Sequence, residues 1–218
     1  MNFSFFKKIW SWKLLLSLFL MLGAMVLFAS ILHEVFLEKE QDDDLLIFEF
    51  FKSHIIQKGL TDLMIDITNL CSPAFIKIAY PALIVLLILF KYYRKAAFTF
   101  LAGAGGLILI GLTKVLFKRP RPQYPLEVIE TGYSFPSGHA TFSFIFYGTL
   151  AYFVWLSHLP KSIKLLLMLF LLGLSVSIGV SRIYLMVHYP SDVLAGFCLG
   201  YFWLFLLIYY FRLKYPLD

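Results

Sequence analysis

Lysine and arginine crowd one short segment of the chain, KVLFKRPRP, at residues 114–122. Its four cations are Lys114, Lys118, Arg119 and Arg121. The prolines at 120 and 122 end the preceding helix and hold Arg121 in an extended turn. One interpretation is a basic flank that contacts lipid headgroups. The other is an anion site, because ammonium and guanidinium groups both bind phosphate oxygens.

A Pro-Ser-Gly-His turn at residues 136–139 opens the next apolar run. Ser137 is a typical helix N-cap, and Gly138 lets the backbone come close to a ligand. The free N–H groups of a helix start attract anions, and His139 in the first turn can reach whatever they hold. Taken alone, this segment is better explained as a plain cap with a histidine at a membrane interface.

The third segment, SRIYLMVHYPSD, spans residues 181–192 and combines Arg182, His188 and Asp192. Pro190 favours the first position of a helix, which places Asp192 in its first turn. From there its carboxylate can reach back to the His188 ring. A carboxylate that holds one ring nitrogen frees the other to act as a nucleophile or base. An aspartate in a first turn is also common without such a role.

The elements that position these segments are apolar enough to cross a membrane. Of 218 residues, 61% are hydrophobic and 15% are charged, whereas soluble domains carry about 25% charged residues. Five uncharged runs of 17–19 residues stand out, and residues 78–90 add a sixth if Lys77 snorkels. We predict an all-α polytopic membrane protein, one domain over 1–218 with six transmembrane helices in a bundle. The predicted spans are about 14–32, 72–90, 96–117, 139–157, 163–182 and 191–211.

The distribution of charge predicts the orientation. Six spans place both termini on one side, which carries ten of the 19 Lys and Arg residues and one of the 13 acids. By the positive-inside rule the termini are cytoplasmic, and the polar segments face the extracytoplasmic side. The first run follows Lys7, Lys8 and Lys13 as in a signal peptide, but its apolar core exceeds the usual ~7–15 residues. We therefore interpret it as a retained anchor.

Other polar residues allow simpler interpretations. Residues 45–66 have apolar side chains at helical spacing, which fits an amphipathic interfacial helix or an acidic loop followed by a packing helix. We predict that the aspartates at 42–44 are solvated and bind no metal. Cys71 and Cys198 have no partner pattern, so we interpret them as small buried residues.

The three polar segments together resemble the signature of the type 2 phosphatidic acid phosphatase family, whose superfamily includes the vanadium haloperoxidases. The matching motifs are Lys114-x6-Arg121-Pro122, Pro136-Ser137-Gly138-His139 and Ser181-Arg182-x5-His188-x3-Asp192. The resemblance implies that His188 is a nucleophile forming a phosphohistidine, that Asp192 orients it and that His139 protonates the leaving oxygen. It also implies a phosphate site without metal or cofactor, made by Lys114, Arg121, Ser137, Gly138 and Arg182.

A site at the membrane interface suits an amphiphilic substrate. We expect an integral membrane phosphatase that removes phosphate from a lipid phosphate or diphosphate, in the cytoplasmic (inner) membrane of a bacterium. Candidate substrates are undecaprenyl diphosphate, phosphatidylglycerophosphate, phosphatidic acid and a lipid A phosphate. The sequence has no basic amphipathic face of the kind that binds nucleic acid, so we expect no nucleic-acid partner. Glu127 and Glu130 lie near the site and could bias the choice of headgroup.

Two alternatives belong to other classes of function. A phosphotransferase would keep the same chemistry but use an acceptor other than water. A non-enzymatic protein that binds anions or lipids, such as a transporter, would explain the cations. It gives no reason for the pairing of His188 with Asp192, and it favours charges near the bilayer midplane.

Overall fold

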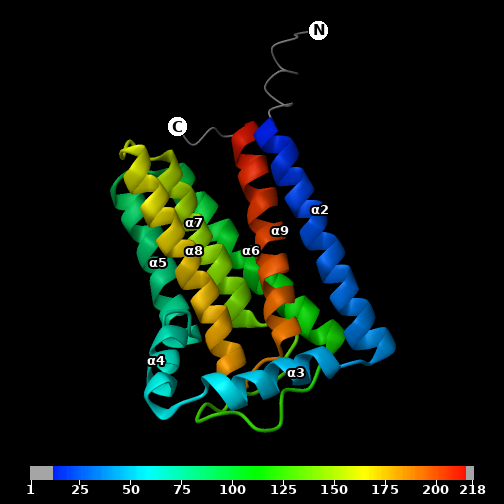
Figure 1. The fold of residues 1–218 in the computed structure, drawn as a ribbon. Helices are drawn as coiled ribbons and strands as arrows, with labels where there is room; N and C mark the ends of the chain where they lie inside the picture. The colour runs from blue at the N-terminus through cyan, green and yellow to red at the C-terminus, as the bar shows by residue number, and fades with distance from the viewer. Residues whose placement is uncertain (1–11, 215–218) are drawn as a thin grey trace.

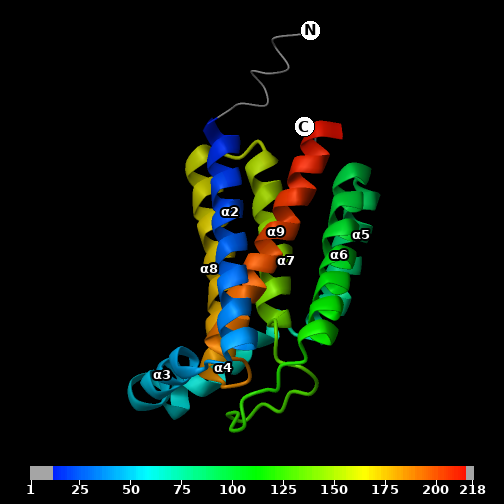
Figure 2. The same cartoon turned by 90° about the vertical axis from the view of Figure 1, so that its right-hand side faces the viewer.

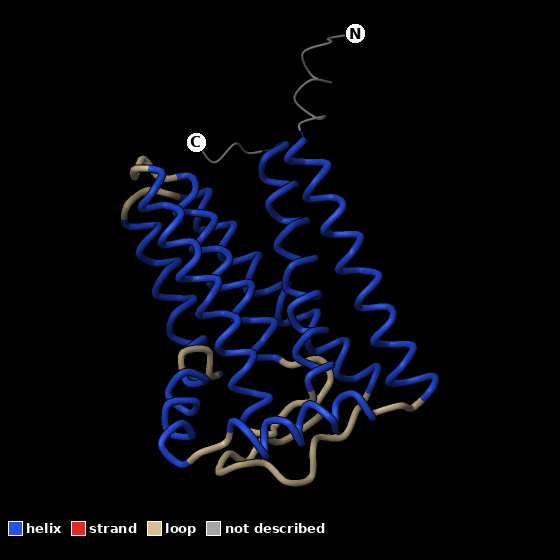
Figure 3. Tube along the Cα trace, viewed as in Figure 1, coloured by secondary structure: helices blue, strands red, loops and turns tan. Residues whose placement is uncertain are grey.

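The structure is a computed structural model that describes residues 12–214. Every regular element in that range is helical (Figure 3). Of the charges used to predict the orientation, Lys7, Lys8 and Asp218 lie outside the described residues. In chain order the elements are α2 (Trp12–Leu32), η1 (His33–Glu38), α3 (Asp42–Phe50), η2 (Phe51–Ile55), α4 (Lys58–Asn69), α5 (Pro73–Leu89), α6 (Tyr93–Phe117), α7 (Gly138–Leu156), α8 (Lys161–Tyr184) and α9 (Pro190–Lys214).

Within residues 12–214, six helical segments are long and apolar enough to cross a membrane. They are Leu15–Glu38, Lys58–Leu89, Tyr93–Phe117, Gly138–Leu156, Lys161–Tyr184 and Pro190–Lys214. Figures 1 and 2 show α2 and α5 to α9 side by side as a bundle. The predicted all-α fold with six candidate spans is thus confirmed.

The two ends of the bundle differ in character. α6 and α8 finish at the end where α7 and α9 begin, opposite the start of α2 and the end of α9 (Figure 1). We call this the site end. The connection between α6 and α7, residues 118–137, is a long irregular loop that lies there. α3 crosses the same end at a steep angle to the spans, while α4 packs on α8.

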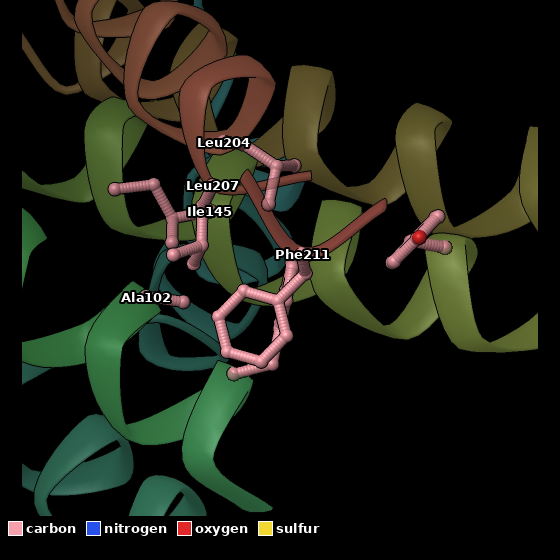
Figure 4. Close-up of a cluster of buried hydrophobic side chains, with 7 residues drawn as sticks. Ala102, Ile145, Leu204, Leu207 and Phe211 are labelled. Carbon is pink, nitrogen blue, oxygen red and sulfur yellow. The ribbon is translucent and has the colours of Figure 1, made fainter. Parts of the chain in front are cut away.

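α7 is the centre of the bundle. Of its apolar stretch 61% is buried, against 6–44% for the other spans, and it contacts α6, α8 and α9. One buried cluster joins α6, α7 and α9 (Figure 4), and its labelled members are Ala102, Ile145, Leu204, Leu207 and Phe211. A helix enclosed in this way holds the residues of its first turn in a fixed place.

Gly196 lets the start of α9 lie close to the start of α7. A Cβ atom at this glycine would lie 2.8 Å from the Ser137 carbonyl oxygen and 3.0 Å from the Ala140 Cβ. The Ser137 N–H also donates to the Asp192 carbonyl oxygen at 3.0 Å. The first turns of these two helices, which carry His139 and Asp192, are therefore fixed against each other.

Candidate active site

The three polar segments predicted to do chemistry meet at the site end. Lys114 lies in the last turn of α6, and Ser137 caps the start of α7. Arg182 lies in the last turn of α8, and Asp192 in the first turn of α9. The fold thus brings together residues that are up to 78 positions apart in the chain (192 − 114).

His188 is buried at the centre of this group, with 1% of its surface exposed. Its Nδ1 lies 3.6 Å from Asp192 Oδ2 and 3.3 Å from the Ser134 hydroxyl oxygen. Its Nε2 lies 3.2 Å from Arg121 Nη1. A guanidinium only donates, so Nε2 accepts, and the proton of the neutral ring belongs on Nδ1. Nε2 is therefore the ring nitrogen that carries a free electron pair toward the cations.

Burial keeps His188 neutral. It lowers the pKa of the ring from 6.5 to about 4, because loss of hydration outweighs the opposing effect of the hydrogen bond and charge of Asp192. At neutral pH the ring therefore has the electron pair that a nucleophile or a base needs.

Asp192 is fully buried and its carboxylate is held from several sides. Oδ1 accepts a hydrogen bond from Arg119 Nη1 at 2.7 Å. Oδ2 accepts from the Ser134 hydroxyl and from the Tyr189 N–H, the latter at 3.0 Å. A carboxylate fixed by this many donors has one orientation, and that orientation faces His188.

The prediction that the aspartates at 42–44 are solvated is wrong for Asp44. Two of the three are exposed, but Asp44 is buried, and its Oδ2 lies 2.7 Å from Arg119 Nη2. It also accepts hydrogen bonds from the Ser191 N–H at 2.8 Å and the Ser191 hydroxyl at 2.6 Å. The physical reason is that α3 crosses the site end and turns one face of its first turn onto the start of α9.

Arg119 joins Asp44 to Asp192 through its two terminal nitrogens. Burial by itself lowers the pKa of this guanidinium, but the charges of Asp192 and Asp44 and their hydrogen bonds raise it overall. The guanidinium also lies 4.1 Å from the ring centroid of Tyr189, which stacks on Phe48 of α3. The line Asp44–Arg119–Asp192–His188 thus connects α3 to the centre of the site.

Arg121 and Arg182, two of the residues predicted to bind phosphate, contact the same carboxylate, that of Glu130. Arg182 is 1% exposed and donates from Nη1 to Thr68 Oγ1 at 2.9 Å and from Nη2 to Glu130 Oε1. The other oxygen of Glu130 lies 3.7 Å from Arg121 Nη2. Glu127, the other acid of this loop, is exposed. In this state of the protein the Glu130 carboxylate neutralises the arginines that a phosphate would need.

The loop between α6 and α7 holds the other cations through its carbonyl groups. Lys114 Nζ donates to the carbonyl oxygen of Tyr133. Arg121 donates from Nε to the Gly132 carbonyl at 3.1 Å and from Nη1 to the Val187 carbonyl at 2.8 Å. Burial lowers the pKa of Arg121, and Glu130 opposes that effect. These contacts aim both side chains at the space in front of His188.

The start of α7 supplies the neutral groups of the site. Ser137 is fully buried, and its hydroxyl accepts the Ala140 N–H at 3.4 Å as an N-cap. Nothing would lie within 4 Å of a Cβ atom at Gly138, so the backbone there faces open space. His139 is buried but lines the same space.

That space is a cavity of about 680 Å³ with two different ends. Its polar end is lined by Lys114, Arg121, Gly138, His139 and His188. From there it continues along α5 and α6, where its walls are apolar, for example at Ile84 and Leu107. Arg182, Ser137 and Asp192 lie behind this lining. The arrangement suits a ligand with a charged head and a long apolar tail.

Comparison with known proteins identifies the family. A sequence model of the PAP2 superfamily matches residues 93–216, more than half of the chain. The protein belongs to the PAP2 superfamily. Together with the six apolar helices, this membership makes the chain an integral membrane protein.

Two curated PAP2 relatives are similar in sequence. Phosphatidylglycerophosphatase B of Bacillus subtilis (strain 168) is 34% identical over 161 residues, which cover 70% of this chain and 75% of that protein. An undecaprenyl-diphosphatase of Sulfolobus acidocaldarius is 35% identical over 124 residues, which cover 53% of this chain and 55% of that protein.

Two solved structures share the PAP2 fold. A transmembrane PAP2 type phosphatidylglycerolphosphate phosphatase from Bacillus subtilis gives a TM-score of 0.80 at 26% identity, over 89% of this chain and 96% of that one. LpxE of Aquifex aeolicus gives a TM-score of 0.58 at 26% identity, over 76% of this chain and 94% of that one.

Sequence reasoning missed three contributors to this PAP2 site. The sequence did not indicate that Asp44 belongs to the site, because its contact with Arg119 joins residues 75 positions apart. Arg119 appeared only as one member of a basic cluster. Ser134 sits in an irregular stretch before the start of α7, where no periodicity indicates which way a side chain points.

Proposed function

We propose that the chain acts as a single membrane-embedded lipid phosphatase domain over residues 1–218, with His188 as the nucleophile. The observation that carries the proposal is the buried, neutral His188, whose Nε2 faces Arg121 while Nδ1 faces Asp192. The family supports it, since two relatives are named as phosphatases of lipids that carry phosphate.

In the first step His188 Nε2 attacks the terminal phosphorus of the lipid. A bond forms between nitrogen and phosphorus, and the bond from phosphorus to the lipid oxygen breaks. Asp192 holds the Nδ1 proton and stabilises the positive charge that develops on the ring. Lys114, Arg121 and Arg182 stabilise the negative charge on the phosphoryl oxygens, together with the free N–H groups at Gly138.

His139 supplies the proton that the leaving lipid oxygen takes up. In the second step it takes a proton from water, which attacks the phosphohistidine and releases inorganic phosphate. Three cationic side chains supply the positive charge of the site, so we propose that turnover requires no metal ion.

The bound state differs from this one at Glu130. Its carboxylate pairs with Arg182 and lies near Arg121. A phosphate that binds both arginines has to displace this carboxylate, because two anions cannot share the same donors at low cost. The loop of residues 118–137 that carries Glu130 has no regular secondary structure and can move it aside.

The cavity supports an amphiphilic substrate, with the phosphate at the polar end and the tail along α5 and α6. Undecaprenyl diphosphate, phosphatidylglycerophosphate, phosphatidic acid and a lipid A phosphate all have this form. We also propose that the termini are cytoplasmic and the site end extracytoplasmic, in the inner membrane of a bacterium. Labelling single cysteines at the α7–α8 turn and in the 118–137 loop with an impermeant reagent tests this orientation.

The decisive experiment measures phosphate release by detergent-solubilised protein, with EDTA present and no added metal. The panel holds the four lipids named above. His188→Ala is the blank, and His158→Ala is the matched control, because His158 is exposed and lies at the opposite end of the bundle. We expect release with the wild type and the control, and none with His188→Ala.

A trapping experiment tests the intermediate. Brief incubation with lipid labelled in its terminal phosphate should give a labelled protein that is stable to alkali and labile to acid, as a phosphohistidine is. Activity that survives in His188→Ala would refute the mechanism. Labelled protein that passes phosphate to an added alcohol faster than to water would favour a phosphotransferase.

A further inference from the structure

Lys77 is a cation that the proposed mechanism does not use. It lies four residues into α5, which begins at Pro73, and so about 6 Å from the helix start at ~1.5 Å per residue. Its side chain is exposed and makes no hydrogen bond or ion pair with any residue between 12 and 214. A lysine this close to a helix end can keep its charge at the membrane interface.

The side chain of Lys77 belongs to the wall of the cavity. Lys77, Tyr80, Pro81 and Ile84 all line it, and their spacing of three, four and seven residues places them on one face of α5. Pro81 and Ile84 form apolar wall, and Tyr80 contributes its ring and a buried hydroxyl. Lys77 is therefore the cation of this face of α5, about one helical turn beyond Pro73, which also lines the cavity.

The charges around this cavity are unbalanced. Lys77, Lys114 and Arg121 line it with Glu130 as the one acid among the lining residues, and that acid is held by Arg121 and Arg182. A lysine that only snorkels to the interface has no need to lie on the cavity face of its helix. An excess of cations around the cavity suits a ligand with more than one negative group.

The orientation of the bound substrate determines which of its groups lies next to Lys77. The terminal phosphate lies against His188, and the tail leads away along α5 and α6. The next charged group on the lipid side of the breaking bond therefore passes Lys77. In a diphosphate this group is the leaving phosphate, which takes up the electron pair of the broken P–O bond. In a phosphatidylglycerophosphate it is the phosphodiester.

We propose that Lys77 is a second phosphate subsite, which binds the phosphate on the lipid side of the breaking bond and makes the enzyme select lipids with two phosphate groups. The proposal rests on the proposed function. The lipid part of a monophosphate leaves as a neutral alcohol and presents no charge to Lys77. The selection therefore comes from one charge-assisted contact that only one class of substrate can make.

The test compares kcat/KM for matched pairs of lipids. Farnesyl diphosphate is paired with farnesyl monophosphate, and phosphatidylglycerophosphate with phosphatidic acid of the same acyl chains. A hydrogen bond to a charged group corresponds to roughly a tenfold to hundredfold effect, so Lys77→Gln should lower the ratio of two-phosphate to one-phosphate kcat/KM by about that factor. Lys77→Arg keeps the positive charge and should retain most of the wild-type ratio.

Lys58→Gln is the matched control. Lys58 is an exposed lysine at the start of α4 and does not line the cavity, so the same loss of charge there should leave the ratio at the wild-type value. An unchanged ratio in Lys77→Gln would overturn the proposal, and so would an equal fall in Lys58→Gln, which would indicate a general effect of surface charge.

A binding measurement separates this proposal from the proposed function. A farnesyl methylenebisphosphonate and a farnesyl phosphonate cannot be hydrolysed at the bridging carbon. The wild type should bind the bisphosphonate more tightly than Lys77→Gln does, by the same factor, even if no lipid in the panel is turned over. Equal binding by the two proteins would refute the subsite, whatever the activity.

Discussion

Replacing Asp44 by asparagine should weaken both the fold and catalysis, although Asp44 lies outside the cavity. The change keeps the shape of the side chain and removes its charge. Arg119, which is 2% exposed, then loses one of its two carboxylate partners. In either orientation the new amide nitrogen faces a group that can only donate, the Ser191 N–H at one position or Arg119 Nη2 at the other. Removing one partner of a buried ion pair costs about 3–5 kcal/mol, and we expect a value near the lower limit, since the amide oxygen still accepts one hydrogen bond.

The effect on catalysis follows from Arg119. With Asp44 neutral, Asp192 alone balances the charge of the guanidinium. The guanidinium then attracts the Asp192 carboxylate more strongly and shifts it relative to His188. We therefore expect kcat to fall, with a smaller change in KM. Unfolding by SDS in mixed micelles, followed by tryptophan fluorescence, measures the free energy of unfolding. Phosphate release measures kcat and KM on the same preparation.

Asp43→Asn is the control for this prediction, because Asp43 is exposed in the same first turn of α3. Its free energy of unfolding should stay within about 0.5 kcal/mol of the wild type. A double-mutant cycle of Asp44→Asn with Arg119→Gln should give a coupling energy of about 1–3 kcal/mol. The reasoning is refuted if Asp44→Asn behaves like Asp43→Asn, or if the coupling energy is near zero.

Three further predictions concern the centre of the site. Glu130→Gln should lower the inhibition constant of inorganic phosphate by about tenfold, because it removes an anion that competes for Arg121 and Arg182; equal inhibition constants would mean that the carboxylate does not compete. His139→Ala should lose far less activity on a p-nitrophenyl phosphate ester than on an alkyl phosphate, because a good leaving group needs little protonation. The same loss on both substrates would count against His139 as the general acid. Burial lowers the pKa of His188 from 6.5 to about 4, so the unfolded chain takes up its proton first as the pH falls. The free energy of unfolding should therefore decrease between pH 6.5 and about 4, and less so in His188→Gln; parallel profiles for the two proteins would contradict this pKa.

Local patterns in the sequence predicted the spans and one contact of the site. The length of an uncharged run sets whether a helix can cross a bilayer, so the bundle follows from the sequence directly. The spacing of four residues between His188 and Asp192 across a helix start predicted their contact, and the two side chains lie 3.6 Å apart.

The contacts that could not be predicted join distant segments. Asp44 and Arg119 are 75 positions apart, and no periodicity in either segment points to the other. Glu130 and Ser134 lie in a loop without regular structure, where the direction of a side chain depends on the tertiary fold. The sequence indicated that Glu130 is near the site, but the pairing of its carboxylate with Arg182 depends on how the loop closes over α8.

The apolar end of the cavity has a kinetic consequence. Its walls include Phe100 and Leu107, which are 60% and 62% exposed on a face of α6 that meets hydrocarbon in a membrane. A lipid can then enter sideways from the bilayer without leaving it. The concentration that governs the rate is in that case the mole fraction of substrate in the surrounding lipid or detergent. Diluting the substrate with inert detergent at constant bulk concentration would slow the enzyme, and encounters would follow two-dimensional diffusion.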